Sequence, residues 1–366
     1  MDVSKIYTAK SVAAFWNSYN ENSNTQPYFG EAIFPPKKKL GLDLKWIKGN
    51  SGVPVALKPT AFDALPNIRN RIGVQAIQTE MPFFREGMLF KESDRQEINR
   101  ALDSNDPYAK VVIENVYNDS VNLINGANVT AERMRMQLLS PEEGSPKIYI
   151  DSDGITYEYD YDVDGKFKDN NFKKLTGTAM WTDYKKSDPI QDIADAQDVI
   201  ENATGSKPTV MLLSKKTMKD IVNNEKVASY ILAKAQASGG AVRVTTGLVQ
   251  QYLLEELGIT CVVNSKKFEE DGVKKAFYPD DMVTLLPAEG LGNTYYGTTP
   301  EESDLMTNNE ANVAIVNTGV AVTVITENKV PVQTKTYASE IVMPSFEGME
   351  KVFVIKTNTT PVGTGE

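Results

Sequence analysis

The sequence predicts an α+β protein, and three regions of the chain carry this prediction. Residues 92–139 show a helical apolar repeat, residues 147–180 alternate with the period of a strand, and residues 207–326 combine strands with helices. Blocks of helix and strand that follow one another in this way are typical of the α+β class. The 366 residues are enough for one large core or two modest ones.

Residues 1–44 are predicted to form an extended arm with short helical pieces. Apolar residues recur at helical spacing between Ile6 and Tyr19, which indicates a short amphipathic helix. The next stretch is rich in turn formers and ends in a lysine run, Lys37-Lys38-Lys39, which we expect to be a solvated patch.

Residues 45–90 predict a long two-stranded loop. Prolines and glycines punctuate the segment, and its weak alternation fits edge strands, because proline cannot donate to a central ladder. A loop of this length with little apolar content has no core of its own. We therefore expect a neighbouring surface to order it, which favours a protein that assembles.

The clearest helix is predicted within residues 92–139. Asp106-Pro107 caps and opens a helical segment, because a missing N–H at the first position leaves no hydrogen bond unmade. Apolar residues then recur along one face of the segment. The dipeptide Asn125-Gly126 predicts a bend or a break in this helix.

Two Asp-Gly pairs, Asp153-Gly154 and Asp164-Gly165, are hairpin turn signals in the period-two region. The next helix is predicted to have Asp188 as its cap and Pro189 as its first residue, and Gly205 is its stop signal. 

Strands and helices alternate over residues 207–326, which predicts a separate α/β unit. Within it, Asp271-Gly272 predicts a tight hairpin turn. We expect Val273 and Phe277 to be core residues, and Lys274 and Lys275 to face solvent or a neighbour. The terminal segment EIVMPSFEGMEKVFVIKT predicts a closing strand pair.

The composition argues against most catalytic classes. The chain has no histidine, which removes Ser-His-Asp and Cys-His nucleophile pairs and His-centred zinc sites. Its one cysteine, Cys261, lies in an apolar strand pattern and cannot form an internal disulfide. We therefore expect no catalytic residue, no cofactor and no metal.

The charge and hydropathy of the chain limit its partners. A net charge of −10 disfavours tight, sequence-specific DNA binding, which requires a basic surface. No apolar run reaches the ~20 residues of a membrane helix, and the N-terminus lacks a signal peptide's apolar stretch. We expect a protein that is made in a cytosol and has no membrane partner.

One acidic stretch, DYDVDGKFKDNN, leaves an alternative function open. It begins like an EF-hand calcium loop with Asp160, Asp162 and Asp164, but its last position is Asn171, where that loop has a bidentate Glu. The flanks also alternate like strands, where an EF-hand requires helices. A hairpin is therefore favoured, and a monomeric calcium-binding β module stays as the alternative.

Several segments, in order along the chain, resemble the lambda-like major capsid proteins of tailed bacteriophages, the phage major capsid protein E family. They are YFGEAIFPPKKKLGLDLKWIKG, the helix opened by Asp106-Pro107, YEYDYDVDGKFKDNN, Trp181 with SDPIQDIADA, EDGVKKAFYPDDMVTLL and EIVMPSFEGMEKVFVIKT. The resemblance covers nearly the whole chain. It implies the capsid fold of tailed phages, with an N-terminal arm (1–44), an extended β loop (45–90), a peripheral domain with a spine helix (91–206 and 327–366) and an axial domain (207–326).

This resemblance implies a structural protein, not an enzyme. A major capsid protein of this family self-assembles into pentamers and hexamers of an icosahedral phage or prophage shell that encloses double-stranded DNA. The implied partners are itself, a scaffolding protein, a portal and a decoration protein, with DNA enclosed without sequence-specific binding. The implied locations are the virion and, during assembly, the host bacterial cytoplasm. An encapsulin-type compartment of the same fold is the alternative.

Candidate residues for subunit contacts lie in two places. The stretch EEDGVKKAFYPDDMVTLLP carries five carboxylates and two lysines, which we interpret as the polar faces of a hairpin and turn that meet neighbouring subunits. The long loop supplies the other candidates. The full set is Trp46, Lys48, Phe62, Arg69, Arg71, Lys274, Lys275, Asp280 and Asp281.

Overall fold

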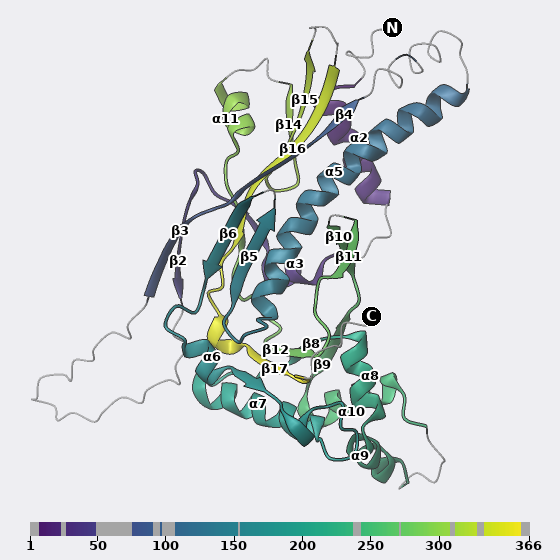
Figure 1. Cartoon of the computed structure of the whole chain (residues 1–366), viewed down its shortest axis with the longest axis vertical. Coiled ribbons are helices and arrows are strands. Elements are labelled where there is room, and N and C mark those ends of the chain that lie inside the picture. Colours follow the sequence, from purple (N-terminus) through teal and green to yellow (C-terminus); the bar gives the residue numbers. More distant parts are fainter. Residues whose placement is uncertain are drawn as a thin grey trace, which may run out of the picture. The chain divides into compact units, whose positions relative to one another are not determined.

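The computed structural model describes residues 7–22, 27–48, 75–90, 96, 107–152, 154–236, 243–270, 272–307, 312–327 and 333–359. The chain divides into two compact units (Figure 1). Unit 1 comprises residues 1–45, 78–134 and 293–345, and unit 2 comprises residues 46–77, 135–292 and 346–366. The division falls within the long helix α5 (Pro107–Leu139), after Met134.

Unit 1 is built on a six-stranded sheet with β16 (Gln333–Pro344) at its centre (Figure 1). The other strands are β1 (Pro36–Lys38), β4 (Phe83–Phe90), β13 (Thr294–Tyr296), β14 (Val313–Val316) and β15 (Val320–Glu327). β16 pairs antiparallel with β15 and β4 along most of its length and with β13 at its end. The last seven residues of β16 are all buried.

The N-terminal helix α2 (Ala9–Asn22) packs into the core of unit 1 with β14, β15 and side chains of α5. Trp16 is buried, and the Tyr7 hydroxyl forms hydrogen bonds with Ser120 (2.6 Å) and Thr336 (2.7 Å). The predicted amphipathic helix is therefore confirmed. Its apolar face is covered by the chain's own sheet, and the N-terminal arm over residues 1–44 stays a prediction.

Helix α5 is continuous, so the break predicted at Asn125-Gly126 is wrong. Gly126 has open space around it, since a Cβ atom there would meet only a Glu86 oxygen, at 3.9 Å. A glycine inside a helix costs about 1 kcal/mol relative to alanine. The neighbouring Leu123 and Ile124 are buried in the core of unit 1, and their packing outweighs that cost.

Unit 2 contains a five-stranded mixed sheet in the order β7-β17-β12-β8-β9. These strands are β7 (Phe172–Lys174), β8 (Val210–Ser214), β9 (Thr260–Asn264), β12 (Met282–Leu286) and β17 (Phe353–Lys356). β12 is antiparallel to both of its neighbours, β17 and β8. All five residues of β12 are buried, as expected for the central strand.

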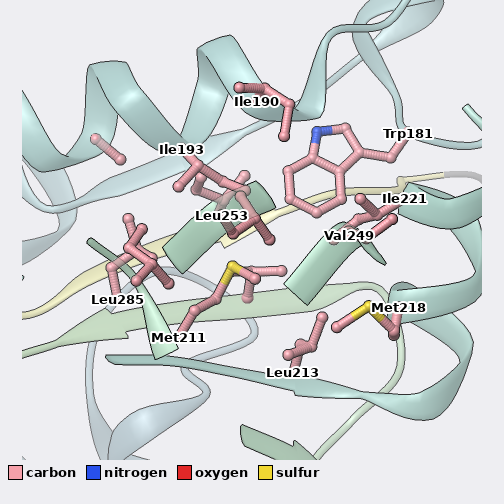
Figure 2. Packing of buried hydrophobic residues seen from close by; sticks show 14 of the residues in the cluster. Trp181, Ile190, Ile193, Met211, Leu213, Met218, Ile221, Val249, Leu253 and Leu285 are labelled. Atoms are coloured by element: carbon pink, nitrogen blue, oxygen red, sulfur yellow. The ribbon is translucent and has the colours of Figure 1, made fainter. Parts of the chain in front are cut away.

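Four helices complete the core of unit 2: α7 (Pro189–Thr204), α8 (Lys215–Asn223), α9 (Glu225–Gln236) and α10 (Thr246–Leu257). Figure 2 shows Trp181, side chains of α7, α8 and α10, and side chains of β8 and β12 pointing into one apolar cluster. Helix α7 begins and ends as predicted. Asp188 caps it by accepting a hydrogen bond from the Gln191 N–H (3.2 Å), and Gly205 ends it with φ 72°.

Three two-stranded ladders accompany the large sheets, β2-β3, β5-β6 and β10-β11. Their strands are β2 (Asp43–Lys48), β3 (Gln75–Glu80), β5 (Lys147–Ser152), β6 (Ile155–Asp160), β10 (Lys267–Glu270) and β11 (Val273–Ala276). Gly154 and Gly272 have positive φ, at 79° and 75°, which confirms the two hairpins predicted there.

The second Asp-Gly signal in the acidic stretch does not make a hairpin. Asp164-Gly165 leads into a short helix, α6 (Lys166–Asn170). Both oxygens of Asp162 accept backbone N–H groups at the start of this helix, from Phe167 (2.8 Å) and Lys168 (3.0 Å). The buried carboxylate therefore stabilises a helical turn where the sequence pattern predicted a strand.

The sequence predicted that the two terminal strands pair with each other. This prediction is wrong, because β16 and β17 belong to different sheets. A 3-10 turn, Met349–Lys351, lies between them. The predicted α/β unit of 207–326 also differs, since β14 and β15 pair with each other and β15 pairs with β16 in unit 1. Alternating apolar residues identify a strand but not the strand that will pair with it.

Candidate functional site

The hairpin β10-β11 presents charged side chains on a short exposed ladder. Its register places Glu269 opposite Lys274, and the Lys275 ammonium forms an ion pair with Glu270. Both lysines are exposed, as predicted. Val273, predicted to be a core residue, is instead 57% exposed, and β11 pairs with β10 in a two-stranded sheet.

The base of this hairpin is apolar. The rings of Phe268 and Phe277 lie 4.9 Å apart, and Phe277 is buried. The hairpin thus has an apolar contact at its foot and a polar ladder beyond it. Such an arrangement suits a surface that meets another protein through charges at its rim.

Asp280 and Asp281 form the turn before β12, and the structure gives them different environments. Asp280 is exposed, whereas the carboxylate of Asp281 is paired with the Lys216 ammonium, which lies 2.9 Å from both oxygens. The Asp281 backbone has φ 62°, a conformation that is costly for a residue other than glycine. Its N–H donates to the Thr217 hydroxyl (3.1 Å), and its carbonyl accepts from the Thr357 N–H (2.8 Å).

Lys216 and Asp281 therefore stabilise a strained turn inside unit 2. Burial lowers the pKa of Lys216, but the hydrogen bond and the charge of Asp281 outweigh it and raise that pKa. Burial also raises the pKa of nearby Asp220, which accepts a hydrogen bond from the Tyr184 hydroxyl at 2.9 Å. The cluster is engaged within the chain, and a contact of Asp281 with a neighbour stays a prediction.

The candidates from the long loop are placed only in part. Trp46 is 5% exposed and stacks on Tyr161 with the ring centroids 5.4 Å apart, so it makes a contact within unit 2. Lys48 ends β2, and its side chain lies outside the described residues, as do Phe62, Arg69 and Arg71.

The sequence did not predict a polar cluster that we call the clamp, formed by Arg85, Glu301 and Ser339. Arg85 lies near the C-terminal end of the predicted loop, residues 45–90. The first turn of α11 (Pro300–Thr307) supplies Glu301, which forms an ion pair with Arg85 of β4 and accepts a hydrogen bond from the Ser339 hydroxyl (2.9 Å). Arg85 also donates to Ser339 at 3.2 Å. These contacts join β4, β16 and α11 in unit 1.

The next residue of α11, Glu302, forms an ion pair with Lys38, the middle residue of the lysine run that we expected to be solvated, whereas Lys37 is exposed as expected. The ammonium of Lys38 pairs with Glu302 and donates to the Gly297 carbonyl (2.8 Å), and its side chain is 29% exposed. The Thr299 hydroxyl caps α11 by accepting the Glu302 N–H (3.2 Å). The sequence pattern of Thr299 followed three residues later by Glu302 is that of a capping box, and it could have located this helix start.

The carboxylates of the calcium alternative are engaged within the protein. Asp162 caps α6, Asp160 lies 3.0 Å from the Lys147 ammonium, and Asp164 lies 2.8 Å from the Lys166 ammonium. Within the described residues there is no group of three or more His, Cys, Asp or Glu that could hold a metal ion.

Cys261 is a poor nucleophile in this fold. It lies in β9 and is half-buried, and burial raises the pKa of its thiol to about 12. A thiol with so high a pKa carries almost no thiolate at neutral pH. Across the ranges that the structure describes, none of the helices has the length and apolar character to cross a membrane.

The comparison with known protein families decides the identity. The family described as phage major capsid protein E matches residues 9–345. The chain belongs to this family. No curated protein matches the chain.

Solved structures agree with this family on the fold. A putative capsid protein of a prophage from E. coli CFT073 is 15% identical, with 96% of this chain and 99% of that chain covered and a TM-score of 0.59. A phage-related protein from Bordetella bronchiseptica RB50 is 14% identical, covers 94% and 96%, and has a TM-score of 0.53. A chain of the cyanophage A-1(L) capsid is 12% identical, covers 91% and 93%, and has a TM-score of 0.51.

The major capsid protein E family and its fold confirm the resemblance found in the sequence. The protein is a capsid protein that forms a shell, and the α+β fold is that of tailed-phage major capsid proteins. Neither the encapsulin-type compartment nor the calcium-binding module is favoured by the family match. The family is structural, and its members associate with themselves to build the phage particle.

Proposed function

We propose that this major capsid protein assembles into pentamers and hexamers of an icosahedral shell around double-stranded DNA. The observation that carries the proposal is the family match, which spans residues 9–345 and therefore both compact units. A shell protein of this family must repeat one contact set around closed rings, which heterologous interfaces allow.

The two units support a mechanical role. Each has its own buried core, around α2 and β14–β16 in unit 1 and around α7–α10 and β8 in unit 2. Close-packed cores have low compressibility, so they resist the deformation that an internal load would impose. We assign the spine helix of the capsid fold to α5 and the axial domain to the α/β part of unit 2.

The charge of the chain supports a container for DNA. A net charge of −10 limits tight binding of the phosphate backbone, so DNA can be enclosed without being held at fixed sites. The proposal includes a scaffolding protein and a portal as assembly partners in the host cytoplasm, and a decoration protein on the finished shell. The hairpin residues Lys274 and Lys275, with Asp280, remain our candidates for contacts between subunits.

Negative-stain microscopy of the purified full-length protein, alone and after co-expression with its scaffolding protein, tests the proposal. We expect closed, roughly spherical shells built from rings with five and six subunits. Discrete monomers under every condition, including high protein concentration and low salt, would contradict it.

A further inference from the structure

The C-terminal half of helix α7 exposes carboxylates that have no cationic partner among the described residues. Asp198 and Glu201 are exposed and form no ion pair with any residue that the structure describes. Asp195 lies one turn before Asp198 and, among the described residues, accepts a side-chain hydrogen bond from the neutral Gln191 amide (2.7 Å). Val199, which is 42% exposed, lies one turn after Asp195 at the edge of this group. We call Asp195, Asp198, Val199 and Glu201 the acidic surface.

A second surface of unit 2 exposes lysines whose ammonium groups form no ion pair with the residues that the structure describes. Lys185 and Lys186 lie in the loop before α7, and Lys215 and Lys219 lie on the outer side of α8. All four are exposed, and none forms an ion pair within the described part of the chain. Tyr184, 37% exposed, lies beside them in the sequence. These four lysines with Tyr184 are the basic surface.

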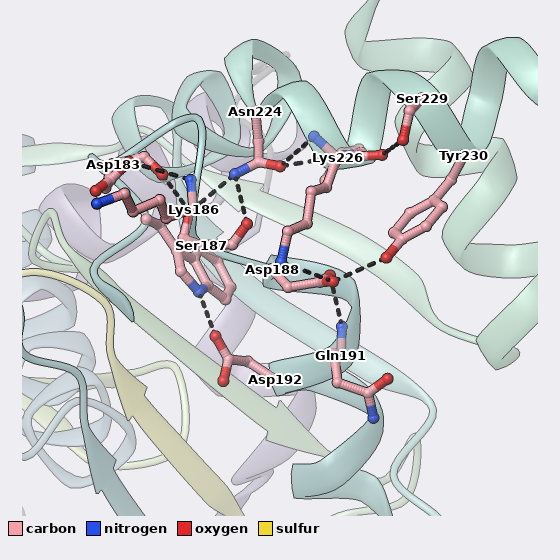
Figure 3. A network of polar contacts seen from close by, with 12 residues as sticks. Asp183, Lys186, Ser187, Asp188, Gln191, Asp192, Asn224, Lys226, Ser229 and Tyr230 are labelled. Carbon is pink, nitrogen blue, oxygen red and sulfur yellow. Dashed lines mark hydrogen bonds and ion pairs between the residues drawn. The ribbon is translucent and has the colours of Figure 1, made fainter. Parts of the chain in front are cut away.

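Hydrogen bonds join the loop to the helix, so the lysines form one surface. The Tyr184 hydroxyl donates to Asp220 of α8 (2.9 Å), and the Tyr184 carbonyl accepts from the Glu225 N–H (2.8 Å). The Asn224 amide donates to the Ser187 hydroxyl (2.8 Å), as Figure 3 shows. The loop before α7 and the turn between α8 and α9 are therefore held together.

Among the described residues, the carboxylates of α7 and its cap that form ion pairs lie toward the N-terminal end of the helix. Asp188 lies 3.5 Å from the Lys226 ammonium, and Asp192 lies 2.8 Å from the Lys173 ammonium (Figure 3 labels Asp188, Asp192 and Lys226). At about 1.5 Å per residue, Glu201 lies roughly 20 Å along the helix from Asp188. The basic surface adjoins the N-terminal end, so its lysines and the unpaired carboxylates are separated on one molecule.

We propose that the acidic surface of one copy of this protein binds the basic surface of a second copy. The two surfaces differ and lie apart on one compact unit, as a heterologous, head-to-tail contact requires. Val199 on the acidic surface and the ring of Tyr184 on the basic surface add exposed apolar area beside the charges, and protein interfaces combine apolar area with a polar rim. Opposite charges across such a contact set its register and disfavour wrong partners. The inference rests on the proposed function and names one contact within the ring.

DNA is the competing partner for the basic surface, since exposed lysines also attract phosphate. The observations favour a second copy, because the matching anions are present on the same unit and are themselves unpaired. DNA binding would leave the acidic surface without a partner, and it predicts no effect of changing Asp198 or Glu201.

Charge reversal in the full-length protein separates these possibilities. One variant carries Asp198→Lys and Glu201→Lys, a second carries Lys185→Glu and Lys186→Glu, and a third combines all four changes. Lysines near the C-terminal end of a helix suit its dipole, so the first variant should fold. Lys168→Glu with Asp169→Lys, two exposed residues of α6, is the matched control.

The assembled fraction is measured by sedimentation under conditions where the wild type forms shells, and circular dichroism checks the fold. We expect each double variant to lose assembly by about tenfold or more, because like charges then face each other. The combined variant should recover to within about threefold of the wild type, and the control should equal it.

Three results would overturn the inference. The first is normal assembly of either double variant, which would leave the proposed function standing. The second is a combined variant no better than its parents. The third is loss of DNA retention in a gel-shift assay by the lysine variant with assembly unchanged, which would assign that surface to DNA. A wild type and control that never assemble would overturn the proposed function as well.

Discussion

Two hairpins of unit 2, β5-β6 and β10-β11, carry the same turn signal and have different surroundings. In the first, Ile148 and Ile150 are buried, and the rings of Tyr157 and Tyr159 stack 6.3 Å apart on the same face of the ladder. In the second, every residue of β11 is exposed. The comparison teaches that an Asp-Gly turn fixes a hairpin locally, whereas packing decides whether the hairpin belongs to the core or to the surface.

A side chain of α5 adds to this difference. The Gln137 amide donates to the Tyr149 carbonyl (2.8 Å) and accepts from the Tyr149 N–H (3.2 Å), so it pairs with the edge of β5 as a neighbouring strand would. This protects the backbone groups of an edge strand from pairing with another chain. We therefore assign β5-β6 a structural role and keep β10-β11 as the surface for subunit contacts.

The largest loss of stability should come from a substitution on the buried face of β5-β6. Ile148→Ala should lower the free energy of unfolding by about 2–5 kcal/mol, because Ile148 is fully buried and the change leaves a cavity. Val273→Ala on β11 is the matched control, and it should stay within about 0.5 kcal/mol of the wild type. Urea unfolding of the unassembled protein measures both. If both variants lost the same unfolding free energy, the two hairpins would not differ in packing as we infer.

A smaller effect is expected from Gln137. Gln137→Ala removes both hydrogen bonds to the Tyr149 backbone and should lower the unfolding free energy by about 1–3 kcal/mol. Gln251→Ala on α10 serves as control, since its amide bonds only the exposed Glu255 side chain. Hydrogen exchange should also quicken at β5 in the first variant alone. An unchanged exchange rate would show that the amide does not hold the strand.

The burial of β9, the strand that precedes β10-β11, can be tested through the reactivity of Cys261. Burial raises the pKa of Cys261 from 9.0 to about 12, so the folded state favours the neutral thiol. The resulting stability is fully present below pH 9 and is lost as the pH rises toward 12. At pH 8.5, alkylation by iodoacetamide should be at least about tenfold slower in the folded protein than in urea. Equal rates would mean that β9 opens with the hairpin.

The smallest effect is expected at the exposed ion pair of β10-β11. Lys275→Ala removes the contact with Glu270 and should change the unfolding free energy by less than about 1 kcal/mol, because water and salt screen exposed charges. Thermal unfolding at low and high salt measures it. If Lys275→Ala lowered the unfolding free energy as much as Ile148→Ala does, β10-β11 would have a structural role like that of β5-β6.

The sequence predicted those features that depend on neighbouring residues. The cap at Asp188, the stop at Gly205 and the turns at Gly154 and Gly272 are local and are confirmed. Partners that are distant in the sequence were not predictable from periodicity. No pattern places β15 beside β16, or shows that Asp162 would cap a helix through backbone N–H groups that follow it.

For the candidate site, too, the sequence predicted local features but not contacts between residues that are distant in the chain. The exposure of Lys274 and Lys275 follows from their position beside a tight turn and is confirmed. The pairing of Asp281 with Lys216 and the burial of Trp46 against Tyr161 join residues far apart in the chain, and only the folded structure places them together. The clamp formed by Arg85 and Glu301 was missed for the same reason.

Sedimentation velocity of the full-length protein over a range of concentrations tests the central claim most directly. A shell-forming capsid protein should pass from free subunits or capsomers to large closed particles over a narrow concentration range, because many weak contacts act together. The scaffolding protein should lower the concentration at which this occurs. A single monomer boundary at every concentration, with and without that partner, would contradict the account.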